Sequence, residues 1–175
     1  MELDYLGILS RWMHILAAIT AVGGTIFVRV ALLPSLAVLA DDQRKALHEQ
    51  VRSRWIKFVM GAIAFLLVSG LYNFFARINS GIPRPYAGLY HALFGMKFLL
   101  ALVIFFVASA LVGRSPALAT MRRNAKFWLT LNMVLAIVVV CISGVLRFVP
   151  SNAKPAVQPA AAVAAASPAK LALPR

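Results

Sequence analysis

The sequence RWMHILAAITAVGGTIFVR, residues 11–29, is apolar enough to lie in lipid and yet contains a histidine. Small residues are frequent in it, and Ala17 and Ala21 show the four-residue spacing of closely packed membrane helices. On a helix, His14 shares a face with these alanines. We therefore expect His14 to point towards other helices, where an ionisable side chain inside a membrane marks a candidate functional site.

The whole chain is apolar, because its 175 residues are 62% hydrophobic and their mean hydropathy is +0.84. Four stretches are each long enough to cross about 30 Å of hydrocarbon, which takes about 20 helical residues. The sequence therefore predicts an all-α, polytopic membrane protein whose single domain, residues 1–150, is an up-down bundle of four transmembrane helices. These spans are about residues 5–28, 55–76, 86–112 and 126–149.

The net charge of +13 would indicate nucleic-acid binding in a soluble protein. Here the basic residues flank apolar spans, which indicates membrane topology and contact with anionic lipid instead. We expect the lipid bilayer as a partner and no nucleic acid. The chain has one cysteine, Cys141, and no CxxCH motif, which excludes an intramolecular disulfide and a covalent c-type haem.

Lysine and arginine are concentrated in residues 35–54 and in the segment between the third and fourth spans. The positive-inside rule places both segments in the cytoplasm and both termini on the periplasmic side of a bacterial inner membrane. The first of these loops is expected to be helical from Asp41, with Asp41 paired to Lys45. His48 lies in this polar stretch, and we interpret it as a solvated histidine.

After Pro150 the composition changes to alanine and proline with few large apolar residues. We expect residues 151–175 to form an external, mostly disordered tail. A docking strap for a partner protein is the alternative.

A faint internal repeat links the second and fourth spans, with SGLYNF at residues 69–74 and SGVLRF at 143–148. Such a repeat suggests two helix hairpins related by duplication.

The second and fourth spans each carry a polar stripe at helical spacing, formed by Ala62, Leu66, Ser69 and Asn73 in one and by Asn132, Ala136, Val139, Ser143 and Arg147 in the other. We expect several polar side chains to gather in the outer half of the bundle, and no span contains a carboxylate. A cationic pocket without acids suits an anionic ligand, such as the propionates of a haem or porphyrin. The candidate binding residues are His14, Lys97, His91, Arg11, Asn73 and Arg147.

Each candidate also has a plainer interpretation. His14 could hydrogen-bond across helices to a serine or tyrosine, and Lys97 could extend along its stem to the outer interface. Arg11 and Arg147 could be ordinary interface residues. If haem is bound, we expect His14 as its axial ligand, with Lys97 across the pocket and His91 as the reserve ligand.

Three segments carry a resemblance to a known family. WMHILAAITAVGGTIFVRVALLP, GMKFLLALVIFF at residues 95–106 and LNMVLAIVVV at 131–140 resemble helices of the copper-resistance CopD superfamily, which includes HemJ-type protoporphyrinogen oxidases. The resemblance covers residues 8–149. It implies a four-helix membrane protein that binds haem b and uses His14 and Lys97 as its functional pair.

The candidate residues and the family resemblance lead to three alternative functions from different classes. The first is a redox protein of HemJ type that binds haem b or a porphyrin. The second is a copper-handling inner-membrane protein of CopD type, with His14 and His91 as candidate metal ligands and methionines as soft ligands for copper(I). The third is an accessory subunit without chemistry of its own, in a homo-oligomer or in a larger membrane complex.

Overall fold

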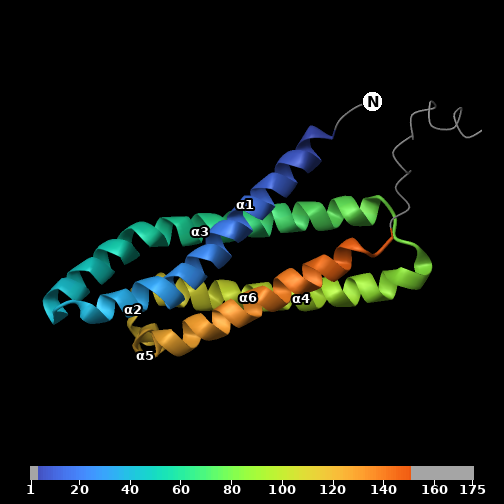
Figure 1. Cartoon of the computed structure of the whole chain (residues 1–175). Coiled ribbons are helices and arrows are strands. Elements are labelled where there is room, and N and C mark those ends of the chain that lie inside the picture. Colours follow the sequence, from blue (N-terminus) through green and yellow to red (C-terminus); the bar gives the residue numbers. More distant parts are fainter. Residues whose placement is uncertain (1–3, 151–175) are drawn as a thin grey trace, which may run out of the picture.

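The computed structural model describes residues 4–150, and four long helices dominate it (Figure 1). They are α1 (Tyr5–Phe27), α3 (Asp41–Asn79), α4 (Arg84–Val112) and α6 (Ala125–Arg147). All four are long and apolar enough to cross a membrane, α1 together with the short helical turns that follow it. The predicted all-α, four-helix membrane fold is therefore confirmed, whereas the predicted tail, residues 151–175, lies outside the described residues.

The helices form two hairpins, α1 with α3 and α4 with α6, and the packing within each hairpin is more extensive than the packing between them. We call these the first and the second hairpin. Between them, α3 packs on α4 and α1 packs on α6, which closes an up-down ring. Figure 1 shows that α1 begins and α6 ends at the same end of the bundle, and that the first turns of α1 extend away from the other helices.

The connection from α1 to α3 is helical but irregular. It comprises a π-helical turn (η1, Val28–Leu32), α2 (Leu33–Ser35) and a 3₁₀ turn (η2, Leu36–Val38). Pro34 explains the irregularity, because its ring has no N–H to donate and collides with the carbonyl four residues earlier in a regular helix. The turn before it widens, so that the N–H of Leu33 donates to the carbonyl of Val28, five residues back.

Helix α3 begins at Asp41 and continues without a break to Asn79, so the expected helical structure of the first basic loop is confirmed. At 39 residues it is about 58 Å long, well beyond the hydrocarbon thickness. Asp41 pairs with Arg44 at 2.5 Å, one residue before the Lys45 that we expected. The expected pair with Lys45 is not among the ion pairs of residues 4–150, and the pair with Arg44 replaces it in the same first turn, where acidic side chains also favour the helix dipole.

The remaining connections are short. A turn at Gly81, whose φ of 76° is readily adopted only by glycine, joins α3 to α4. A 3₁₀ turn (η3, Pro116–Leu118) and α5 (Ala119–Arg123) join α4 to α6. We call the end of the bundle that carries residues 28–54 and 113–126 the basic end.

Close packing within the first hairpin depends on Gly24. A Cβ atom built at this position would overlap the indole ring of Trp55 on α3, so the absence of a side chain lets the two helices approach. The second hairpin packs most tightly at Val107 and Ala110, which are each only 1% exposed. Large apolar side chains on all four helices point outward, as expected for contact with lipid chains.

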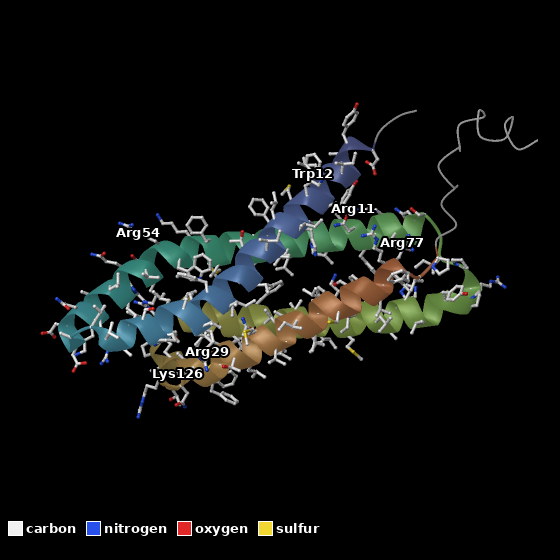
Figure 2. The ribbon with its side chains drawn as sticks, viewed as in Figure 1. Arg11, Trp12, Arg29, Arg54, Arg77 and Lys126 are labelled. Atoms are coloured by element: carbon white, nitrogen blue, oxygen red, sulfur yellow. The ribbon has the colours of Figure 1, made fainter. Side chains whose placement is uncertain are left out.

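Arginines connect the two hairpins near their ends. At the basic end, Arg29 Nε donates to Thr130 Oγ1 at 2.8 Å and Arg52 donates to the carbonyl of Gly113 at 3.0 Å. At the opposite end, Arg77 of α3 donates to the carbonyl of Val149, just after α6 (Figure 2). The two hairpins are therefore held together by polar contacts at their ends.

Candidate functional site

His14 points into the bundle, as the sequence predicts, and contacts α3. Its Nδ1 lies 2.9 Å from Ser69 Oγ. Its Cε1 would lie 3.4 Å from a Cβ atom built on Gly70, an ordinary van der Waals distance, so the imidazole packs directly on α3 at this glycine. One turn earlier, Ser10 Oγ donates to the carbonyl of Ser69 at 3.5 Å. The cross-helix hydrogen bond to a serine, which the sequence left as an alternative for His14, is thus present.

The hydrogen bonds of Ser69 determine the tautomer of His14. Ser69 has one hydroxyl proton, which it donates to the carbonyl of Phe65 in the preceding turn. With that proton used, its oxygen accepts from His14, and on this basis we assign the proton of the neutral imidazole to Nδ1. Nε2 then carries the lone pair and is the nitrogen that can accept a proton or bind a metal.

Lys97 of α4 is the charged residue of the second hairpin whose field acts on His14. It is half-buried and lies within electrostatic reach of the imidazole. The structure thus brings together the two residues that the family resemblance pairs. His14 comes from the first hairpin and Lys97 from the second, so the site spans the boundary between them.

The other predicted residues lie at various distances from this centre. Asn73 is half-buried on α3, one turn beyond Ser69, and fits the predicted polar stripe. Arg11 and Arg147 are exposed, Arg11 on the first turns of α1 (Figure 2). Whether these three residues bind a ligand stays a prediction.

His91 lies among aromatic rings. It is exposed, and its ring contacts Phe74 and Tyr90 edge-on, with centroids 6.3 Å and 5.8 Å away. Among residues 4–150, no hydrogen bond connects it to His14. His48 is exposed on the polar part of α3, in agreement with the solvated position expected for it.

The sequence analysis missed an aromatic cluster next to the site. Phe74 of α3 stacks on Phe94 of α4 with ring centroids 3.8 Å apart and an interplanar angle of 14°. Tyr90 and Phe98 extend this stack along α4. The i, i+4 spacing of Tyr90, Phe94 and Phe98 was the available signal, because such residues share one face of a helix.

Asn132 of α6 is the second deeply buried polar residue. It is only 3% exposed, and its Oδ1 has no hydrogen-bond partner. The sequence placed Asn132 and Ala136 on one inward stripe of this helix, and both are buried. An amide oxygen without a donor inside a bundle is a place where a water molecule or a ligand donor would be favourable.

The donor set at His14 suits some cofactors better than others. In the described part of the chain, no three His, Cys, Asp or Glu side chains are grouped so that they could hold a metal ion. A bare ion needs several protein ligands, whereas haem brings its own equatorial nitrogens and needs only axial ones. A single imidazole with a fixed tautomer therefore fits haem better than a bare copper ion.

A groove in the first hairpin does not include His14. It has a volume of about 400 Å³, lies between α1 and α3, and is lined by residues such as Met13, Thr20, Lys57 and Phe65. A smaller groove of about 260 Å³ lies beside Gly24 and Trp55. Both follow the seam of the first hairpin, and neither is lined by His14, whose contacts are with Ser69 and Gly70 of α3.

Comparison of the chain with protein-family models, with curated proteins and with solved structures found no match. The resemblance to the CopD superfamily therefore rests on the sequence segments quoted above. The fold itself, a multi-pass helical membrane protein, rests on the four apolar helices.

Proposed function

We propose that this membrane protein binds haem b, or a related porphyrin, between its two hairpins in a redox role, with His14 as axial ligand. The observation that carries the proposal is the hydrogen bond between His14 Nδ1 and Ser69 Oγ. Histidines that bind metals usually donate their other ring N–H to a neighbouring group, which fixes the ring and directs the free nitrogen. Ser69 provides this support from a position that is itself buried.

The surroundings of His14 supply the other groups that such a ligand requires. Lys97 of α4 lies within electrostatic reach of the imidazole and would either pair with a propionate or act as a second axial ligand once deprotonated. Stacked rings of Phe74 and Phe94 lie on α3 and α4, the helices that carry Ser69 and Lys97, and offer flat apolar surface between the hairpins. When bound, haem would supply one-electron chemistry at its iron, with a potential tuned by the axial ligands and by burial.

The arrangement of the hairpins is compatible with a ligand between them. Packing is extensive within each hairpin and weaker between them, and the connecting hydrogen bonds of Arg29, Arg52 and Arg77 lie near the ends. A flat macrocycle beside His14 would therefore separate the hairpins at mid-height while these end contacts persist.

The test is the visible absorption spectrum of the purified full-length protein after haem supplementation. The wild-type protein should show a Soret band. His14→Ala should abolish it, whereas His48→Ala, which removes an exposed histidine outside the site, should leave it intact. Lys97→Met should shift the band or lower haem occupancy while the protein remains folded, as judged by size-exclusion chromatography and thermal unfolding.

The outcomes distinguish the competing functions. A wild-type protein without a Soret band, or a His14→Ala protein that keeps it, would contradict the haem proposal. Copper in metal analysis of the wild-type protein, lost in His14→Ala or His91→Ala, would favour copper handling instead. Co-purification with a fixed stoichiometry of another membrane subunit, without either cofactor, would favour the accessory role.

We also propose that the basic end faces the cytoplasm of a bacterial inner membrane, so that both termini are periplasmic. The proposal is supported by the concentration of lysine and arginine at this end. In a Cys141→Ser background, a cysteine introduced at Ala153 should react with an impermeant reagent added outside the cell. A cysteine at Ala117 should be protected, and the reverse pattern would contradict this orientation.

A further inference from the structure

The π-helical turn after α1 carries an arginine that contacts the second hairpin. Arg29 is half-buried, and its Nε donates to Thr130 Oγ1 on α6 at 2.8 Å. Thr130 in turn donates to the carbonyl of Lys126 at 2.9 Å, one turn earlier on the same face of α6. Figure 2 shows Arg29 and Lys126 together at the basic end, whereas Arg54 lies apart on α3.

Within the described part of the chain, these two cations have no anionic partner. Among residues 4–150, ion pairs form at Arg44, Arg52 and Arg114, and neither Arg29 nor Lys126 takes part in one. No aspartate or glutamate occurs after Glu49 in the whole sequence. Lys126 and the Thr130 hydroxyl that binds Arg29 lie one turn apart on one face of α6, so an anion bound there would be attracted by both positive charges.

The hydrogen bond to Thr130 leaves the two Nη groups of Arg29 available for a ligand. Nε is occupied, which fixes the plane of the guanidinium, while among the described residues no partner is found for either Nη group. A guanidinium presented in this way can bind two oxygens of one phosphate, and a lysine ammonium beside it adds a point charge. The residues therefore match the chemistry of a phosphate group.

The position of the pair along the membrane normal identifies the source of that phosphate. Lys126 and Arg147 lie near the two ends of α6 and are separated by about 32 Å along its axis, close to the hydrocarbon thickness. Lys126 and the adjacent Arg29 would thus lie at the level of the lipid headgroups. At this depth, the phosphates of anionic lipids are the most abundant anions.

We propose that Arg29 and Lys126 form a headgroup site for an anionic phospholipid at the basic end, between α1 and α6. The site is independent of His14 and of any haem. A lipid bound there would bridge the two hairpins at the contact of Arg29 with Thr130, and its acyl chains would lie against the outward-facing apolar side chains of α1 and α6.

Native mass spectrometry of the protein in mild detergent tests the proposal, with phosphatidylglycerol and phosphatidylcholine of matched acyl chains as probes. We expect preferential binding of phosphatidylglycerol, weakened by about fivefold or more in Arg29→Gln and in Lys126→Gln, the effect of losing one cation near a membrane surface. Arg54→Gln removes the same charge from the same end of the bundle and should leave the affinity unchanged.

Each other result would overturn the proposal. Equal losses in all three variants would show general attraction to a basic surface. Equal binding of the two lipids, or displacement of phosphatidylglycerol by inorganic phosphate, would show that no lipid headgroup is selected. Lys126→Gln keeps the contact between Arg29 and Thr130, so its result is informative even if Arg29→Gln impairs folding.

Discussion

The two hairpins each bury one polar side chain to the same extent but surround it differently. Ser69 in the first hairpin and Asn132 in the second are both 3% exposed. Ser69 donates to the carbonyl of Phe65 and accepts from His14, whereas Asn132 Oδ1 has no partner. The two side chains are equally buried, but their contributions to stability have opposite signs, because a hydrogen-bonded polar group stabilises the packing and an unpaired one destabilises it.

The comparison also separates two kinds of helix contact. In the first hairpin, small residues and the hydrogen bonds of Ser69 with His14 and Ser10 hold α1 against α3. In the second, tight apolar packing at Val107 and Ala110 tolerates an unpaired amide nearby on α6. The predictions below test this contrast, first through the packing of the first hairpin and then through the two buried polar groups.

The largest expected effect is that of Gly24→Ala, which would break the packing of the first hairpin. The added Cβ would overlap the ring of Trp55, and that ring is also stacked on Phe58 with centroids 5.9 Å apart. We expect the free energy of unfolding, measured by SDS titration in mixed micelles, to fall by about 2 kcal/mol.

The matched control for this substitution is the neighbouring glycine. A Cβ at Gly23 would meet no atom within 4 Å, so Gly23→Ala should cost nothing and should gain slightly from helix propensity. Equal stability of the two alanine variants would contradict the close approach of α1 and α3 at Gly24.

The next effect concerns the satisfied polar group. Ser69→Ala would leave His14 Nδ1 without its partner and should lower the free energy of unfolding by about 1 kcal/mol, the usual scale for a hydrogen bond between membrane helices. Ser143→Ala is the control, because Ser143 makes only the hydrogen bond to its own helix, to the carbonyl of Val139 at 2.7 Å. A loss of equal size in both variants would argue against the contact with His14.

For Asn132, whose amide oxygen has no partner, we expect a substitution to have the opposite effect on the free energy of unfolding. Asn132→Leu removes an unpaired amide oxygen while keeping a similar volume, so we expect the free energy of unfolding to stay constant or to rise by up to about 1 kcal/mol. The same SDS titration measures it. A clear destabilisation would mean that Asn132 receives a hydrogen bond in the membrane, for example from a water molecule, and would remove the contrast with Ser69.

The smallest effect is a pH dependence at the basic end. Hydrogen bonds from Arg114 at 2.5 Å and from Arg52 hold the pKa of Glu49 below its usual value of 4.5. Because the folded pKa is the lower one, this stabilisation is complete above about pH 4.5 and is lost as the pH falls through the folded-state pKa.

Glu49 is exposed, so salt should also weaken its contribution. Glu49→Gln should therefore have a slightly lower thermal midpoint than the wild type at neutral pH and low salt. The difference should vanish in acid and at high salt. A difference that is constant with pH would exclude the ion pair as its cause.

The sequence predicted the parts of this fold that depend on composition and helical period. The four spans, the start of α3 at Asp41 and the inward direction of His14 are confirmed, because apolar runs and 3.6-residue spacing determine them locally. The stripe that contained Ser69 was also correct, and the cross-helix partner of His14 was among the alternatives.

What the sequence could not supply are features that depend on the pairing of distant segments. Pro34 was a local signal for an irregular turn after Arg29 that the sequence analysis did not use, but the contact of Arg29 with Thr130 spans 101 positions of the chain and has no local signal. The close approach of Gly24 to Trp55 and the missing partner of Asn132 likewise arise only when helices meet. The ligand at His14 and Lys97 stays a prediction.

The uninterrupted length of α3 has a mechanical consequence. A continuous helix behaves as a stiff rod, and Glu49 and Ser69 lie on the same rod, about 30 Å apart along its axis. A twist applied at the polar head of α3, where Glu49 contacts Arg114, would therefore rotate Ser69 and shift the oxygen that orients His14. A change at the polar head of α3 would in this way reach the interior of the bundle.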